Sequence, residues 1–67
     1  MAVVKVIEIL AESTKSWEDA AQIAVTEASK TVKNIQSVYI KDFQATVSDG
    51  LITRYRVDAK ISFVVVD

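Results

Sequence analysis

The side chains that could carry out chemistry in this 67-residue chain are carboxylates and guanidinium groups, because the chain contains no histidine and no cysteine. The usual groupings for nucleophilic and acid–base catalysis need one of those two residue types. A pair of carboxylates could also move protons, but no spacing marks two of the acids as partners. The acids considered are Glu8, Glu12, Asp42, Asp49 and Asp58. We therefore expect a protein that is not an enzyme.

The C-terminal segment places a second set of polar groups on one face of a strand. Residues 51–67 alternate between apolar and polar side chains, which predicts one long β-strand with a buried face. Arg54, Arg56, Asp58 and Lys60 fall on its polar face. Arg56 could hold a phosphate or carboxylate through two parallel hydrogen bonds. Alternatively, the four side chains form ion pairs between subunits.

The N-terminal segment is also rich in β-branched residues and predicts a strand from Val3 to Leu10. Both of its faces are apolar, and each carries one charge, Lys5 on one and Glu8 on the other. The face that points inward is therefore left open. A polar turn over residues 12–15 follows.

A helix is expected next, with Ser16 as its N-cap and Asp19 as an aspartate variant of the capping box. Lys30 and Lys33 near its predicted C-terminus complement the helix dipole. Small and apolar residues recur at helical spacing. This stripe consists of Trp17, Ala20, Ala21, Ala24, Ala28, Val32 and Ile35. An alanine-rich stripe lets a helix lie close against a sheet.

Residues 37–48 predict the second strand, in which a change of apolar phase near Lys41–Asp42 indicates a β-bulge. Asp49-Gly50 predicts a tight hairpin turn into the last strand. The order is β-α-β-β, and the last strand can lie between the other two, antiparallel to both. The expected fold is a single α+β domain over residues 1–67, a three-stranded antiparallel sheet packed on one helix.

The size of the chain favours assembly with further copies. The last strand could extend about 50 Å, and a chain of 67 residues that is 51% apolar cannot cover it. Without cysteine or histidine, neither disulfides nor a structural zinc site is expected to stabilise so small a domain. The net charge of −1 gives no reason to expect nucleic-acid binding. No apolar run reaches transmembrane length, so we expect a soluble cytoplasmic protein.

Several stretches of the chain together resemble the dodecin family, from about residue 3 to residue 66. They are VVKVIEILAES, SWEDAAQIAVTEASKTVKNI, VSDG, YRV and KISF. The resemblance implies a β-α-β-β protomer in a hollow homododecamer with cubic symmetry. It also implies riboflavin or its phosphate, FMN, stacked in pairs between aromatic side chains at two-fold axes. The implied role is storage, buffering or photoprotective quenching of flavin.

The chain departs from that family pattern at its flavin-binding positions. Ser37 stands where the resemblance implies the stacking tryptophan, and Arg56 where it implies a glutamine. Gln44 and Val64 match arginines of other members. Tyr39, two positions from Ser37, could replace part of the missing aromatic plane. We therefore expect Ser37, Tyr39, Gln44 and Arg56 to mark a flavin site that is weakened, altered or lost.

Three alternatives remain open at this stage. The first is a shell without flavin that binds cations such as calcium or is purely structural; an acid near a three-fold axis would occur three times there. Its ligand residues are not assigned from the sequence. The second is an enzyme that uses a carboxylate or Arg56 at a subunit junction. The third is a designed or engineered variant of the family. Trp17 is interpreted as a core or interface anchor rather than as a ligand platform.

Overall fold

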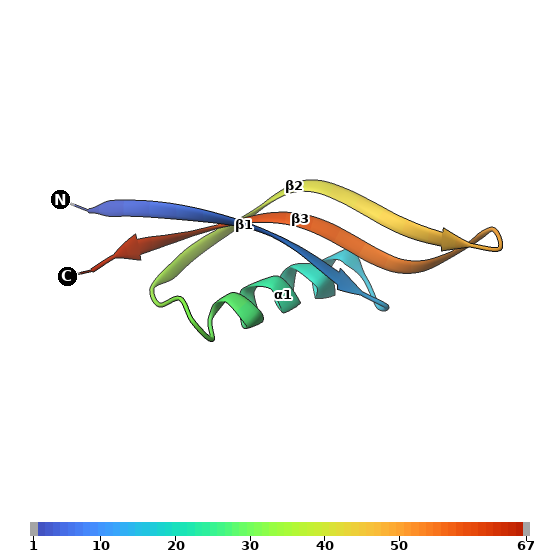
Figure 1. Ribbon diagram of the computed structural model, residues 1–67, viewed down its shortest axis with the longest axis horizontal. Helices are drawn as coiled ribbons and strands as arrows, with labels where there is room; N and C mark the ends of the chain where they lie inside the picture. The colour runs from blue at the N-terminus through green and yellow to red at the C-terminus, as the bar shows by residue number, and fades with distance from the viewer. Residues whose placement is uncertain (1, 67) are drawn as a thin grey trace.

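Three strands and one helix form an elongated protomer in the computed structural model, which describes residues 2–66 (Figure 1). The elements are β1 (Val3–Ser13), α1 (Trp17–Ala28), β2 (Ile35–Ser48) and β3 (Leu51–Val65). The strand order is β1-β3-β2, with β3 antiparallel to both neighbours. The predicted α+β fold, with its β-α-β-β order and central last strand, is confirmed. Within the described residues, no helix has the length and apolar character needed to cross a membrane.

The helix covers only the middle of the sheet. Its 12 residues span about 18 Å at 1.5 Å per residue, whereas the longest dimension of the protomer is 51 Å. Figure 1 shows the β2–β3 hairpin extending beyond α1 at one end and the two termini extending at the other. Both ends of the sheet therefore have no helix over them.

The core lies between α1 and the sheet and consists largely of alanine. The odd-numbered face of β3 points toward it, as the period-two pattern predicts, and the same holds for the odd-numbered face of β1. The structure thus resolves the open choice for β1. Small side chains allow the helix and sheet to approach closely, so modest apolar volume fills the space between them. The buried members are Ala11, Ala20, Ala24, Ala28, Val57, Ala59 and Ile61.

Local signals at the start of the helix act largely as expected. Ser16 Oγ accepts a hydrogen bond of 2.9 Å from the backbone N–H of Asp19, which confirms the N-cap. The Asp19 carboxylate accepts a bond of 2.6 Å from Ser13 Oγ, so it ties the end of β1 to α1. The strand β1 continues through Glu12 and Ser13, where a polar turn was expected, because both residues pair with β3.

The prediction that the helical stripe continues through Val32 and Ile35 is wrong. The helix ends at Ala28 with Ser29 as its C-cap, and no basic residue lies in its last turn. The chain then turns through a hydrogen bond of 2.8 Å from Val32 N to Ala28 O. Asn34 adopts a left-handed conformation with φ of 63°, which asparagine tolerates better than most residues. The reversal lets Ile35 enter β2 rather than extend the helix.

The two backbone features predicted for β2 and the hairpin are present. A register shift occurs between Ile40 and Asp42, as the phase change indicated. Asp49 and Gly50 have φ values of 50° and 75°, the sign that the hairpin-favouring type I′ turn requires at both positions. The expected strand over residues 51–67 ends at Val65, and its last predicted residue, Asp67, lies outside the described residues.

Candidate functional site

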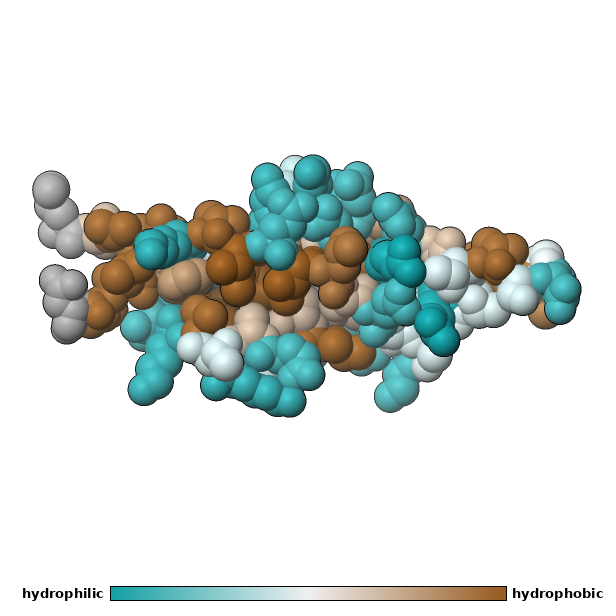
Figure 2. Space-filling view, in the orientation of Figure 1, coloured by the Kyte–Doolittle hydropathy of each residue, from teal (hydrophilic) through white to brown (hydrophobic). Residues whose placement is uncertain are grey.

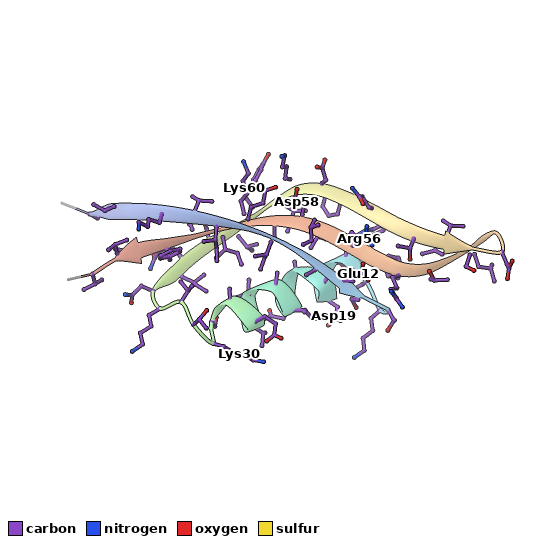
Figure 3. All side chains as sticks on the ribbon, viewed as in Figure 1. Glu12, Asp19, Lys30, Arg56, Asp58 and Lys60 are labelled. Atoms are coloured by element: carbon purple, nitrogen blue, oxygen red, sulfur yellow. The ribbon has the colours of Figure 1, made fainter. Side chains whose placement is uncertain are left out.

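The four residues predicted to mark a ligand site all lie on the face of the sheet turned away from α1, here called the outer face. Arg56 is an even-numbered residue of β3, and each of the other three pairs with an even-numbered residue of β3. Directly paired residues share a face of the sheet. Ser37 pairs with Ser62, Tyr39 with Lys60 and Gln44 with Arg56. Figure 3 shows Asp58 and Lys60 on this same side, opposite the helix.

These four residues form two groups at different positions along the outer face. Ser37 and Tyr39 lie at the start of β2, whereas Gln44 and Arg56 lie nearer the hairpin. Seven positions along an extended strand correspond to about 23 Å, which separates Ser37 from Gln44. A single protomer therefore does not bring the four side chains together around one small ligand.

At the first group, polar hydroxyls stand where an aromatic plane was implied by the resemblance. Ser37 Oγ lies 2.5 Å from Ser62 Oγ in a direct hydrogen bond. Tyr39 is 65% exposed, so aromatic surface is open to solvent there. The group can hydrogen-bond to a ligand, but its stacking surface is limited to Tyr39.

At the second group, Arg56 is paired within its own chain. Its Nε and Nη2 donate to Glu12 Oε1 over 2.9 and 2.5 Å, and Arg54 Nη1 lies 3.4 Å from Glu12 Oε2. Figure 3 shows Glu12 and Arg56 close together on neighbouring strands. The hydrogen bond from Arg56, followed by the charges of both arginines, lowers the pKa of Glu12 despite its partial desolvation. Glu12 thus engages both guanidinium groups, and its single negative charge balances one of their two positive charges.

Sequence reasoning did not identify Glu12 as this partner. The two residues are 44 positions apart and become neighbours only through the β1–β3 register, in which Glu12 faces Arg56. A register fixed from the apolar phases of both strands would have revealed the pair, but the phase of β1 was ambiguous.

Carboxyl groups meet at the centre of the outer face. Asp58 lies opposite Asp42 across the β2–β3 pairing, and Glu8 lies diagonally across β3 with its carboxylate 3.8 Å from Lys41 Nζ. Asp58 Oδ1 is buried and has no hydrogen-bond partner among the described residues. A proton shared with Glu8 would satisfy it.

This arrangement raises the pKa of Asp58. The nearby Glu8 carboxyl, with which Asp58 can share a hydrogen bond when one of the two is protonated, is the largest cause, and desolvation and the Glu8 charge act in the same direction. The charges of Lys41 and Lys60 act in the opposite direction. Binding of a proton or of a cation would therefore reduce the electrostatic repulsion between these carboxyl groups.

One chain alone does not supply a complete metal site among residues 2–66. No group of three or more aspartate, glutamate, histidine or cysteine side chains is placed there to hold a metal ion. Calcium takes six to eight oxygen ligands, so a calcium site built on these acids needs oxygen atoms from further copies or from water.

Trp17 lies on the other side of the sheet and packs against the core. Its indole Nε1 donates a hydrogen bond of 2.8 Å to the backbone carbonyl of Gln44. Its ring makes edge-on contacts with Tyr55 and Phe43, with centroids 4.9 and 6.1 Å away. These contacts support its interpretation as a packing anchor that holds the start of α1 to β2 and β3.

Comparison with known proteins gives one family. The sequence model of the Dodecin family matches residues 3–66. A relative named calcium dodecin, from Mycobacterium tuberculosis, is 42% identical over 64 residues, which cover 94% of this chain and 89% of that protein.

Solved structures agree with this result. A crystal structure of M. tuberculosis calcium dodecin, described as a calcium-chelating immunodominant antigen with a novel calcium-binding site, is similar with a TM-score of 0.81 and 37% identity; it covers 91% of this chain and 87% of its own. A point variant of Thermus thermophilus dodecin is similar with a TM-score of 0.94 and 24% identity over all of both chains. The second likeness supports the fold alone.

Proposed function

The chain belongs to the dodecin family, and on this premise we propose that it forms a cytoplasmic homo-oligomeric shell of twelve copies that binds a small ligand without catalysing a reaction. The ligand we propose is a cation such as calcium. The observation that supports this choice over flavin is the Ser37–Ser62 hydroxyl pair, which stands where the family resemblance implies an aromatic stacking platform.

The surface of the protomer supports assembly. A compact monomer of 7.4 kDa is expected to expose about 4,200 Å², whereas this chain exposes 4935 Å². Its Cα radius of gyration is 13.7 Å, against about 10.9 Å for a compact chain of its length. Figure 2 shows hydrophobic surface at the end that carries the termini and again near the hairpin tip. Among residues 2–66, ten large apolar side chains are more than half exposed: Val3, Val4, Val6, Leu10, Tyr39, Phe43, Val47, Leu51, Ile52 and Val66.

The choice of a cation is supported by the carboxyls on the outer face. Glu8 and desolvation both oppose the ionisation of Asp58, and Asp58 Oδ1 has no hydrogen-bond partner among residues 2–66. Rotational symmetry would repeat these oxygens around an axis and complete the calcium coordination that one chain leaves partial. The relative at 42% identity carries calcium in its name.

Thermal unfolding of the assembled protein in calcium and in chelator tests the proposal. With free calcium at 100 times its dissociation constant, a site present only in the folded state adds about 2.7 kcal/mol of stability. The melting temperature should rise by several degrees, and Asp58→Asn should lose most of that rise. Asp49→Asn, which changes an acid in the hairpin turn, serves as the matched control and should keep it. Equal melting curves in calcium and chelator would overturn the proposal.

Flavin is the second candidate, and the exposed ring of Tyr39 is the observation that favours it. Stacking on a single tyrosine supports weak binding at most. Titration of riboflavin and FMN with the assembled protein, followed by flavin fluorescence, measures it. Saturable quenching that Tyr39→Leu abolishes would support a flavin site based on Tyr39, and unchanged fluorescence would exclude it.

A further inference from the structure

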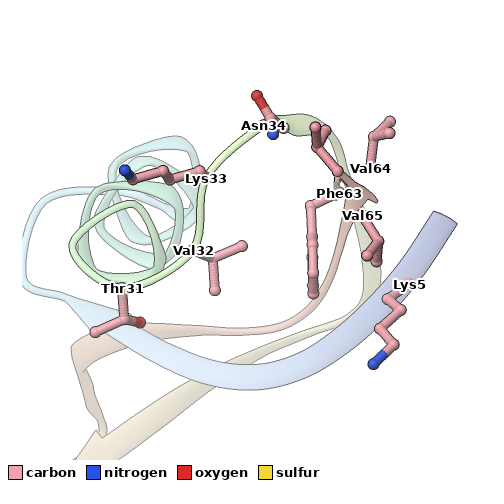
Figure 4. Close-up of a pocket in the computed structure, with 9 residues that line it drawn as sticks. Lys5, Thr31, Val32, Lys33, Asn34, Phe63, Val64 and Val65 are labelled. Carbon is pink, nitrogen blue, oxygen red and sulfur yellow. The ribbon is translucent and has the colours of Figure 1, made fainter. Parts of the chain in front are cut away.

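The two ends of the protomer that α1 leaves uncovered differ in shape, and the end that carries the termini is hollow. A pocket of about 520 Å³ lies there on the helix side of the sheet. It forms because α1 ends at Ala28, while β1 and β3 continue to Val3 and Val65. Figure 4 shows Val32 of the loop after the helix and Phe63 of β3 on opposite sides of it. Nine residues line the pocket: Lys5, Thr31, Val32, Lys33, Asn34, Phe63, Val64, Val65 and Val66.

The opposite end of the protomer is a projecting, mostly apolar ribbon of two strands. β1 ends at Ser13, opposite Tyr55, so Leu51–Arg54 pair only with β2. Residues 46–53 are called the hairpin ribbon below, and among these eight residues only Asp49 is charged. Three of their apolar side chains are more than half exposed: Val47, Leu51 and Ile52. Exposed apolar surface of this kind is typical of a contact with another molecule.

The pocket and the hairpin ribbon complement each other in shape and polarity. The pocket volume is within the range that encloses a small organic molecule, so a turn and its adjacent side chain fit inside it. No acidic side chain lines the pocket, so Asp49 would meet no like charge there. Leu51, next to the turn, would replace water against the valines and the phenylalanine of the lining.

The exposed surface and the length of the protomer favour a contact between different copies. The chain exposes about 700 Å² more than a compact monomer of its mass, and a standard interface covers about 800 Å² on each partner. Leu51 and Phe63 are about 40 Å apart along β3 at 3.3 Å per residue, so the hairpin ribbon cannot reach the pocket of its own chain. A contact between two different surfaces of the same protein is heterologous, and it forms a ring where the rotation between copies closes.

We propose that the hairpin ribbon of one copy docks into the pocket of the next copy, head to tail. This inference rests on the homo-oligomeric assembly proposed above and adds which surfaces meet in it. The contact involves neither the carboxyl groups of the outer face nor a bound ligand. It buries the apolar surface that each protomer exposes at both of its ends.

Disulfide cross-linking tests the contact, because the chain has no cysteine of its own. The double variant Leu51→Cys/Val32→Cys is assembled in chelator, oxidised and analysed on a denaturing gel without reductant. A disulfide needs Cα atoms within about 7 Å of each other, so only different copies can be joined. Head-to-tail docking links each copy to two neighbours and should yield covalent species larger than a dimer. Leu51→Cys/Gln22→Cys, with its second cysteine on the exposed face of α1, is the matched control and should yield none.

The other outcomes separate this contact from the assembly itself. Dimers formed by the single variant Leu51→Cys would mean that two hairpin ribbons meet each other, which would overturn the proposal. An assembled double variant without cross-links between positions 51 and 32 would overturn it and leave the shell of twelve copies standing. A monomer in size-exclusion chromatography of the unmodified protein would overturn both proposals.

A charge at Leu51 provides a second test that needs no cross-link. Leu51 is 70% exposed in the protomer, so Leu51→Asp should leave the fold of the single chain intact and place an unpaired charge in the contact. The protein concentration at which the assembly dissociates should rise by about tenfold or more. Gln22→Asp should leave that concentration unchanged. Equal dissociation of Leu51→Asp and the unmodified protein would overturn the proposal.

Discussion

Replacing Ser37 by tryptophan should create or strengthen flavin binding on the outer face. Ser37 is exposed, and among the described residues its hydroxyl bonds only to Ser62, so a larger side chain can extend into solvent without displacing the core. The substitution removes that hydrogen bond, at a cost of about 0.5–1.5 kcal/mol to the stability of the protomer. The indole ring supplies the aromatic plane that Ser37 lacks.

The gain in affinity follows from the stacking energy. An aromatic stack contributes about 0.5–1.5 kcal/mol beyond the area it buries, which corresponds to roughly a 2- to 13-fold lower dissociation constant per stack. Burial of the apolar ring surface adds to this at about 25 cal/mol per Å². If two copies stack on the same ligand, the effect is larger.

Quenching of flavin fluorescence by the assembled variant measures this effect. Ser37→Leu is the control, because it removes the same hydrogen bond and adds apolar area without a flat π-surface. We expect strong saturable quenching with tryptophan and little with leucine. Equal quenching by both variants would refute the stacking argument. A Ser37→Trp variant that assembles and leaves flavin fluorescence unchanged would show that position 37 is not at the flavin site.

Three further predictions concern stability. Trp17→Phe removes the indole bond to the Gln44 carbonyl and should cost about 0.5–1.5 kcal/mol; chemical denaturation of the assembled variant measures it, and an unchanged midpoint would contradict it. Ala24→Leu places a large side chain at a position that is 1% exposed and should cost about 1–3 kcal/mol, whereas the exposed Gln22→Leu should cost far less in the same assay. Asp58→Asn should stabilise the protein in chelator near neutral pH, because the raised pKa of Asp58 means that its ionisation opposes folding. The wild-type protein should hold this contribution to its stability below pH 3.8 and lose it as the pH rises through the raised pKa of Asp58. The variant should keep its stability over the same range, as measured by thermal melts from acid to neutral pH. A variant that loses as much stability as the wild type would contradict the assignment.

Much of the fold could be predicted from the sequence, because the signals that specify it are local. The alternation along residues 51–65 fixes the buried face of β3, the Ser16 hydroxyl starts the helix, and Asp49-Gly50 supplies the positive φ angles that the turn needs. Each signal operates within a few residues of its own position. The order of these elements then restricts the sheet to few topologies.

The end of the helix could not be predicted in the same way. The apolar spacing through Val32 and Ile35 fits a helix as well as it fits the observed loop and strand. The choice depends on bonds from a distant segment, such as Val64 N to Asn34 O, and on the burial of Ile35 against the core.

The sequence by itself determined the element types, their order and the absence of an aromatic residue at position 37. Only the tertiary structure decided which side chains meet on the outer face, because strand register brings together residues that lie far apart in the chain. Arg56 faces Glu12, Ser37 faces Ser62, and Asp58 lies beside Glu8 only once β3 is aligned between its two neighbours. Charge and hydrogen bonding at these positions are properties of that alignment, since a shift of one residue would turn each of these side chains to the other face of the sheet.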